Sequence, residues 1–461
     1  MPRVLKPTIA KTLIAISPFA VALLMMCSQG SVQADPPAES VEVTNSGTIA
    51  FQNATLETMG PDGRLEGATL VIRDGKIIAV GTDVTVPDDA RIVDASGKTI
   101  MPGIVDPYFV FSSQGASLGG GGRGGRGGRG GRGGFQQQPA PTGGGFRRLS
   151  EYFYPYGIDL VPFARSGITT ANLVQSGTGQ SAVAQVLPDD LENLLVQPDG
   201  FLFAAVTNQT NSLNFVRNGL NPQANRGGGR RGGFGGGGGF GGRGRGRGSF
   251  DANDVLLQDQ DQQDQDDEDE EEEENTTDTA ELWNQVRAGD RPLFVNVNNT
   301  ATVLHLLKAL DDYEDVNVAM VCSGSNVFEV MDNLSGRNVT LILQPGIDNV
   351  PYTTERVNIP RMALDSDVPF VFSFSLNRGQ INAHQDDPMF VMSMLVKSGL
   401  PRQAALNAVT IGPANLIGME DAVGSLEENK QANLLIFDGD PLETGSRLEQ
   451  VMVEGRTVHE N

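Results

Sequence analysis

The chain has 461 residues, with 34 Lys or Arg and 57 Asp or Glu, so its formal net charge is −23 at pH 7. This acidic balance argues against general affinity for nucleic acid, although local basic patches are still compatible with it. The length suffices for a large domain with a smaller one attached. Hydrophobic residues make up 39%, below the usual range, because low-complexity segments dilute the core-forming ones.

The N-terminal residues have the pattern of an export signal. Basic residues precede an apolar stretch from Thr12 to Met26, which is shorter than a typical membrane span. The tripeptide Val32-Gln33-Ala34 fits a cleavage site, so residues 1–34 are predicted to be a signal peptide. The mature chain is then periplasmic or secreted, without a membrane span. Lipidation at Cys27 is the alternative, which the bulky Met before it disfavours.

Residues 46–103 form a series of short predicted strands. Within them Asp74-Gly75 separates two apolar runs, the pattern of a hairpin with a type I′ turn. The series ends at Pro102-Gly103 and holds too few strands to close a sandwich. We expect two apolar stretches near the C-terminus, residues 434–438 and 451–458, to pair with these strands.

Low-complexity segments interrupt the rest of the chain. Residues 115–148 are rich in Gly, with Arg123, Arg126, Arg129 and Arg132 at a three-residue step. Residues 222–250 mix Arg, Gly and Phe, and residues 259–274 are an acidic run. Such compositions cannot bury a core, so we predict disordered insertions. An Arg-Gly-Phe segment could bind a polyanion by charge and stacking, but the adjacent acidic run would compete for its arginines.

Between and after the insertions, apolar strands alternate with helical segments, which predicts a parallel sheet or barrel. Without the insertions, residues 104–421 are about as long as the roughly 250 residues of a (β/α)₈ barrel. The predicted fold is therefore α/β: a TIM-type (β/α)₈ barrel over residues 104–421 and a small β-sandwich built from residues 46–103 and 422–461.

Four motifs resemble those of the amidohydrolase superfamily, in particular its secreted, imidazolonepropionase-like branch. They are the Pro102-Gly103 joint followed by Asp106, the step Gly167-Ile168-Thr169-Thr170, the segment from Thr410 to Gly418, and the return from Gly424 to Leu434. The resemblance implies a β-sandwich that leads into a barrel. It also implies one or two divalent metals, held by histidines of strands 1, 5 and 6 and an aspartate after strand 8. Such a metal supplies a hydroxide for attack on an amide or ester.

The positions that the resemblance implies for metal ligands hold other residues. They are Tyr108 and Val110 on strand 1, Asn296 or Asn298 on strand 5, Ser323 on strand 6 and Ser375 on strand 8. Val has no donor atom and Tyr is not among the usual zinc ligands. We therefore expect no metal, no other cofactor and no catalytic residue of the family's kind. These positions would instead line a pocket that hydrogen-bonds a neutral molecule.

Only three histidines are present, and they are widely spaced. His305 is predicted to lie mid-helix and His459 in the C-terminal tail. His384 follows strand 8 and could line the pocket, or form a weak metal site with Asp386 and Asp387. After signal cleavage Cys322 is the only cysteine left, and we interpret it as a buried small hydrophobe.

Three functions stay open. The first is an exported pseudoenzyme that binds a small molecule, or that partners an intact amidohydrolase relative or a second copy of itself. The second is a hydrolase of C–N bonds in cyclic amides with an altered site. The third is a polyanion binder that acts through its Arg-Gly loops.

Overall fold

The computed structural model describes residues 47–110, 146–151, 153–157, 160–175, 177–206, 210–222, 279–322, 325–350, 353–374 and 387–461. These residues all fall in one compact unit, Asn45–Asn461. The export signal, the acidic run and most of both Arg/Gly insertions lie outside the described residues and stay predictions. Among the helices that are described, none combines the length and apolar character needed to cross a membrane.

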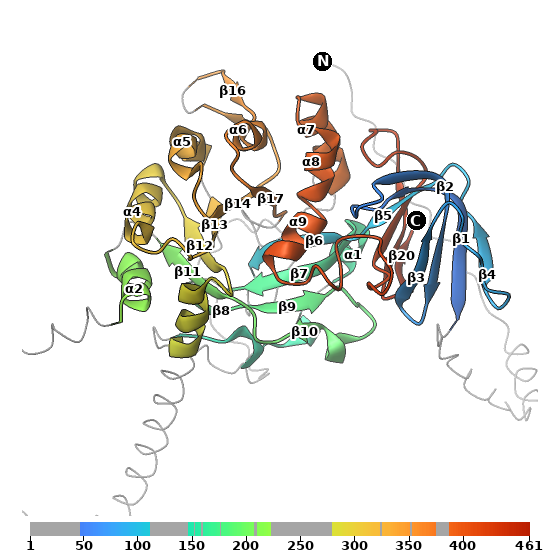
Figure 1. The fold of residues 1–461 in the computed structure, drawn as a ribbon, viewed down its shortest axis with the longest axis horizontal. Helices are drawn as coiled ribbons and strands as arrows, with labels where there is room; N and C mark the ends of the chain where they lie inside the picture. Colours follow the sequence, from blue (N-terminus) through green and yellow to red (C-terminus); the bar gives the residue numbers. More distant parts are fainter. Residues whose placement is uncertain are drawn as a thin grey trace, which may run out of the picture. The chain divides into compact units, whose positions relative to one another are not determined.

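One sheet contains strands from both ends of the chain (Figure 1). Its strands are β1 (Thr48–Glu57), β2 (Arg64–Arg73), β3 (Lys76–Gly81), β4 (Arg91–Asp94), β5 (Thr99–Pro102), β18 (Leu434–Phe437), β19 (Leu448–Val453) and β20 (Arg456–Glu460). β18 runs antiparallel to β5, with Leu434 opposite Pro102. The C-terminal strands thus extend the N-terminal ones in an eight-stranded sheet of order β20-β19-β18-β5-β1-β2-β3, with β4 beside β1.

The turns of this sheet follow from local sequence. Asp74 and Gly75 have φ angles of 50° and 79°, which confirms the predicted hairpin, since a type I′ turn requires positive φ at both positions. A side chain on Gly75 would also meet the carbonyl oxygen of Glu454 at 2.9 Å. Asn429, where the resemblance implies Gly, has a φ of 72°, a conformation that Asn tolerates.

The α/β part contains two mixed sheets. The four-stranded sheet has the order β10-β9-β7-β6 and the six-stranded sheet β17-β14-β13-β12-β11-β8. Their strands are β6 (Ile104–Val110), β7 (Ile168–Val174), β8 (Thr178–Gln180), β9 (Ala182–Gln185), β10 (Leu195–Gln197), β11 (Leu202–Val206), β12 (Leu293–Val297), β13 (Val318–Cys322), β14 (Val339–Leu343) and β17 (Phe370–Phe372).

Parallel pairing dominates these sheets but is interrupted once. β6 pairs with β7 in parallel, and β11, β12, β13, β14 and β17 pair in parallel in succession. Between these two groups β9 runs antiparallel to β7, and β8 antiparallel to β11. A parallel connection needs a dozen or more residues, whereas only residues 175–177 link β7 to β8. The chain therefore returns antiparallel where the predicted barrel has its third parallel strand.

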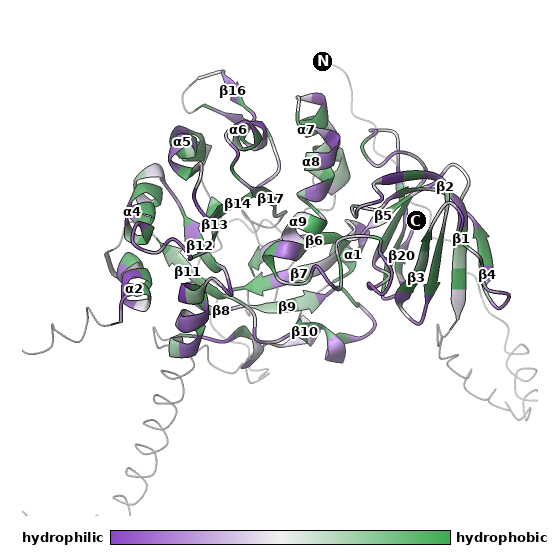
Figure 2. Cartoon of the chain, in the orientation of Figure 1, coloured by the Kyte–Doolittle hydropathy of each residue, from purple (hydrophilic) through white to green (hydrophobic). Residues whose placement is uncertain are grey.

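Helices follow most of the parallel strands (Figure 1). They are α1 (Val161–Arg165), α2 (Thr210–Leu220), residues 279–288, α4 (Thr300–Leu310), α5 (Met331–Leu334), α6 (Ile359–Asp365), α7 (Pro388–Lys397), α8 (Arg402–Asn407) and α9 (Ile411–Leu416). Leu306 of α4 and Leu395 of α7 share a core with Val295 of β12. The neighbouring Phe294 belongs to a second core, since successive side chains of a strand point to opposite faces. Figure 2 shows these strands as largely hydrophobic and α7 as mixed.

The first Arg/Gly insertion ends earlier than predicted. Residues 146–148, assigned to it above, are part of the described fold. The backbone N–H of Gln180 donates to the carbonyl oxygen of Arg147 at 2.7 Å, and Arg148 bridges to Gln180 in parallel. Gly179 permits this contact, because a side chain there would lie 2.3 Å from the same oxygen. Backbone pairing with β8 thus orders the last residues of this segment.

A network of ion pairs among four charged side chains joins the eight-stranded sheet to α8. Its members are Glu57, Arg64, Arg402 and Asp440. The buried Glu57 carboxylate pairs with Arg64 at 2.7 Å and also with Arg402. Arg402 pairs with Asp440 at 2.8 Å, and Arg64 with Asp440 at 3.3 Å. Burial raises the pKa of Asp440, but hydrogen bonds from Arg402 and Leu442 and the charge of Arg402 outweigh it, so the pKa is lowered.

We expect Asp440→Asn to reduce the free energy of unfolding at pH 7 by about 1–2 kcal/mol, between the values for exposed and buried pairs. Folding lowers the pKa of Asp440. The carboxylate therefore stabilises the fold fully above its unfolded-state pKa near 4, and this stabilisation is lost as the pH falls through its folded-state pKa. Denaturation at pH 7 and below about pH 4 measures both effects. The exposed pair Arg361–Asp365 supplies the control Asp365→Asn, which should lose much less stability because solvent screens an exposed pair. Equal losses from both variants would contradict the prediction.

Candidate functional site

The candidate site lies toward the carboxyl ends of β6 and β12. Tyr108 of β6 is 4% exposed and belongs to the second core. Its phenol meets Asn296 of β12, which is half-buried. Burial raises the pKa of Tyr108 to about 12, and the hydrogen bond from Asn296 only partly opposes this shift. The structure thus brings together two of the predicted pocket residues, with the phenol protonated at physiological pH.

Side chains from neighbouring elements fix the backbone at Tyr108. The buried Asp106 carboxyl accepts from the N–H of Tyr108 at 3.0 Å with one oxygen, and from the N–H of Phe374 at 3.2 Å with the other. The Ser373 hydroxyl donates to the carbonyl oxygen of Tyr108 at 2.9 Å. The Asn172 amide of β7 donates to the carbonyl oxygen of Pro107 at 3.0 Å. These contacts hold the tyrosine between β7 and the segment after β17.

The other predicted pocket positions on these strands are more peripheral. Val110 ends β6, is partly buried and packs beside the second core. Asn298 is exposed, and its side-chain Oδ1 accepts from the side-chain amide nitrogen of Asn299 at 2.8 Å. Asn299 in turn caps α4 by accepting from the N–H of Thr302. Ser323, Ser375 and His384 lie outside the described residues, so their place in the pocket stays a prediction.

The remaining reactive side chains lie away from Tyr108. His305 is exposed and lies mid-helix on α4, as predicted, whereas His459 lies in the paired strand β20 and not in a free tail. Cys322 ends β13 and is half-buried, not fully buried as predicted. Its thiol lies 3.8 Å from the carbonyl oxygen of Met320, and the burial of its sulfur raises its pKa to about 12. A thiol with such a pKa is a poor nucleophile.

The described residues of the site do not fit a catalytic metal. Val110 offers no donor, Asn298 is tied to Asn299, and ligation by Tyr108 would require a phenolate that burial disfavours. Both oxygens of Asp106 face backbone N–H groups. Within the ranges that the structure describes, no three His, Cys, Asp or Glu side chains lie close enough to share an ion. What the arrangement offers is a neutral phenol and neutral amides, which donate to and accept from an uncharged molecule.

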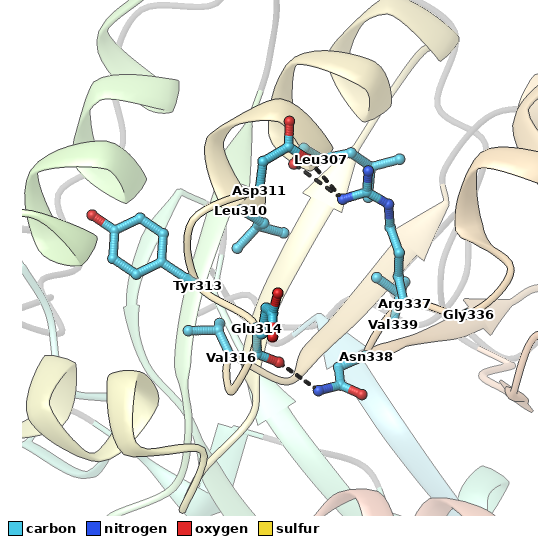
Figure 3. A pocket seen from close by; sticks show the side chains of 10 residues that line it. All are labelled: Leu307, Leu310, Asp311, Tyr313, Glu314, Val316, Gly336, Arg337, Asn338 and Val339. Carbon is cyan, nitrogen blue, oxygen red and sulfur yellow. Dashed lines mark hydrogen bonds and ion pairs between the residues drawn. The ribbon is translucent and has the colours of Figure 1, made fainter.

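A cavity of about 370 Å³ lies at the opposite ends of the strands (Figure 3). It is lined by Val316 before β13, Val339 at the start of β14, and the loops around them. Its polar groups bind one another: Arg337 pairs with Asp311 at 3.0 Å, and the Asn338 amide donates to the carbonyl oxygen of Glu314 at 2.7 Å. The cavity is therefore separate from the Tyr108 site.

Sequence comparisons connect parts of the chain to known hydrolases. The family model described as "Amidohydrolase family" matches residues 391–459. The imidazolonepropionase of Thermoplasma volcanium is 30% identical over 139 residues, which cover 28% of this chain and 34% of the relative. That of Acidiphilium cryptum is 32% identical over 146 residues, with the same shares. The matched region thus spans about a third of the length of these curated relatives.

The fold is similar over a much longer stretch. An amidohydrolase from Thermotoga maritima has a solved structure that matches with a TM-score of 0.62 and 16% sequence identity. The match covers 90% of this chain and all of that one, 100%. At this identity the likeness concerns the fold alone.

We expect Tyr108→Phe to leave the alkaline rise of tyrosine absorbance between about pH 9 and pH 11 nearly unchanged, although an ordinary tyrosine titrates near 10. The reason is that burial raises the pKa of Tyr108 to about 12, so its phenol stays largely protonated below about pH 11. A spectrophotometric titration of both proteins measures this. The chain has 6 tyrosines, so the loss of one tyrosine's share below pH 11 would contradict the expectation.

Proposed function

The chain belongs to the amidohydrolase superfamily, and from this premise we propose that it is an exported member that binds a small neutral molecule and does not hydrolyse through a metal ion. The observation that carries the proposal is the pairing of Tyr108 with Asn296 at positions that the family resemblance implies for metal ligands. A protonated phenol and an amide form directional hydrogen bonds with uncharged polar groups. They supply neither a tight metal site nor a general base near neutral pH.

The architecture proposed around this site is a (β/α)₈ barrel over residues 104–421, with a composite β-sandwich of residues 46–103 and 422–461. Strand order supports it: β6-β7-β9 and β8-β11-β12-β13-β14-β17 follow one another as in a barrel. The bonds from Asp106 to Phe374 and from Ser373 to Tyr108 join β6 to the end of β17. In such a barrel the carboxyl ends of the strands carry the functional site, which is where Tyr108 and Asn296 lie.

The proposal extends to partners and location. The partner class that fits the site is a small molecule with amide or hydroxyl groups. An intact amidohydrolase relative or a second copy of the chain is the proposed protein partner. Periplasmic or secreted location rests on the N-terminal signal pattern.

A second candidate function is hydrolysis of C–N bonds in cyclic amides at an altered site. It is favoured by the relatives, which carry the name imidazolonepropionase. In that case Ser375 or His384, which follow β17 in sequence, would supply the nucleophile or base.

Elemental analysis of the mature protein, purified without chelators, should find well under one zinc per chain, because the described residues offer no convergent ligands. The matched variant Tyr108→His with Val110→His places two imidazoles at the strand 1 positions and should bind zinc more tightly than the wild type. One tightly bound zinc per wild-type chain would overturn the proposal.

A thermal-shift screen of cyclic amides, imidazolones and dipeptides tests the binding site. A compound that stabilises the wild type should bind Asn296→Leu about tenfold more weakly, since a neutral hydrogen bond contributes roughly 0.5–1.5 kcal/mol. Asn338→Leu, in the cavity at the opposite strand ends, is the control and should bind normally. Turnover of a compound that is lost in Ser375→Ala or His384→Ala would instead establish the hydrolase.

A further inference from the structure

Three neighbouring side chains of β7 and β9 carry buried oxygen atoms without a hydrogen-bond partner in the part of the chain that the structure describes. The atoms are Thr170 Oγ1, Asn172 Oδ1 and Gln185 Oε1. The three residues are 0%, 0% and 1% exposed. A buried acceptor that no donor meets is destabilising, and such atoms are rare in folded proteins. Their clustering calls for a common partner.

Strand register places the three side chains on one face. Thr170 lies directly opposite Gln185 in the antiparallel ladder, and Asn172 lies opposite Val183. Directly opposed side chains share a face with Cβ atoms about 5 Å apart, and diagonal neighbours are about 7–8 Å apart. Val183 and Val174 on the same face belong to the second core, with Phe294. Thr170 and Gln185 are therefore direct neighbours, with Asn172 diagonal to Gln185, on a face that also carries apolar side chains.

The orientation of the Asn172 amide is fixed by its neighbour. Its nitrogen donates to the carbonyl oxygen of Pro107 at 3.0 Å. The reverse orientation would set two oxygens against each other. Asn172 Oδ1 is therefore an acceptor that points away from Pro107.

The Gln185 amide is oriented by a relay that begins at a carboxylate. Glu454 accepts from the Gln431 amide nitrogen at 3.3 Å, which leaves the Gln431 oxygen as an acceptor. The Gln185 amide nitrogen donates to that oxygen. Gln185 Oε1 is thus also an acceptor, and Thr170 supplies the only hydroxyl among the three side chains.

We propose that this polar cluster binds a buried water molecule, which donates to Asn172 Oδ1 and Gln185 Oε1 and accepts from the Thr170 hydroxyl. The two amide oxygens and the hydroxyl call for a guest that offers two donors and one acceptor. Water meets this need, and three bonds are typical of buried waters. A carbonyl or carboxylate guest would repel both amide oxygens.

The bound water also has a consequence for the candidate site. It locks the Asn172 amide, whose nitrogen holds the Pro107 carbonyl next to Tyr108. The water then helps to position the backbone that carries Tyr108. This inference is independent of the proposed function, because a metal-dependent hydrolase on the same strands would carry the same cluster.

A high-resolution crystal structure of the full mature chain is the direct test. We expect one density peak within hydrogen-bond distance of Thr170, Asn172 and Gln185, and no such peak in Thr170→Val. A well-defined map with no peak between the three oxygens overturns the proposal.

Thermal unfolding gives a second readout, in which the sign of the shift decides. If the hydroxyl binds water, Thr170→Val should lower the melting temperature by about 2 °C, because the water loses a donor. The matched control is Thr410→Val. The fully buried Thr410 hydroxyl donates to the carbonyl oxygen of Leu406 at 2.7 Å, so this variant should also lower the melting temperature. If no water binds the Thr170 hydroxyl, its removal should stabilise the fold, because a buried polar group without a hydrogen-bond partner is destabilising. A Thr170→Val melting temperature equal to or above that of the wild type therefore overturns the proposal.

Discussion

The buried carboxyl group of Asp106 holds together the part of the fold on which the candidate site depends. Over the described residues no backbone ladder pairs β6 with β17. Asp106 of β6 connects them by accepting from the N–H of Phe374, which follows β17, and the Ser373 hydroxyl adds a bond to the Tyr108 carbonyl oxygen. The other Asp106 oxygen accepts from the N–H of Tyr108 on the same strand. Each acceptor oxygen of Asp106 is matched to a backbone donor, which offsets the cost of burying the group. The same bonds that join the strands therefore also position Tyr108.

That constraint links the scaffold to the chemistry of the site. Because Tyr108 is held inside an apolar core, its phenol is deprived of water and its pKa rises to about 12. A more exposed tyrosine in the same sequence position would keep more of its solvation, and ionisation would be easier. The neutral character of the site thus follows from the packing of β6 between its neighbours as well as from the identity of the residues.

The features of the fold that the sequence predicted have local causes. The Asp74-Gly75 hairpin and the left-handed Asn429 are set by residues that tolerate positive φ. The pairing of β18 with β5 could be predicted because the N-terminal strands alone are too few to form a complete sandwich. The antiparallel β8 and β9 were not predicted, since a run of Gly and Ser there resembles a loop. Their direction depends on the short link after β7 and on the close approach of Arg147 to Gly179, which composition does not reveal.

For the site, family positions led to Tyr108 and Asn296 but not to their contact, because register between β6 and β12 is a long-range property. The positioning residues Ser373 and Asn172 were missed. A polar residue in the middle of an apolar strand, as Asn172 is in β7, was the available signal.

The shared sheet of the chain ends also determines when the protein can finish folding. During synthesis β5 has β1 on one side, and its other neighbour, β18, emerges from the ribosome only after nearly the whole chain. Until then the nascent polypeptide presents an open strand edge that invites wrong pairing. Until β18 pairs with β5, the sheet lacks three of its eight strands and cannot complete its core.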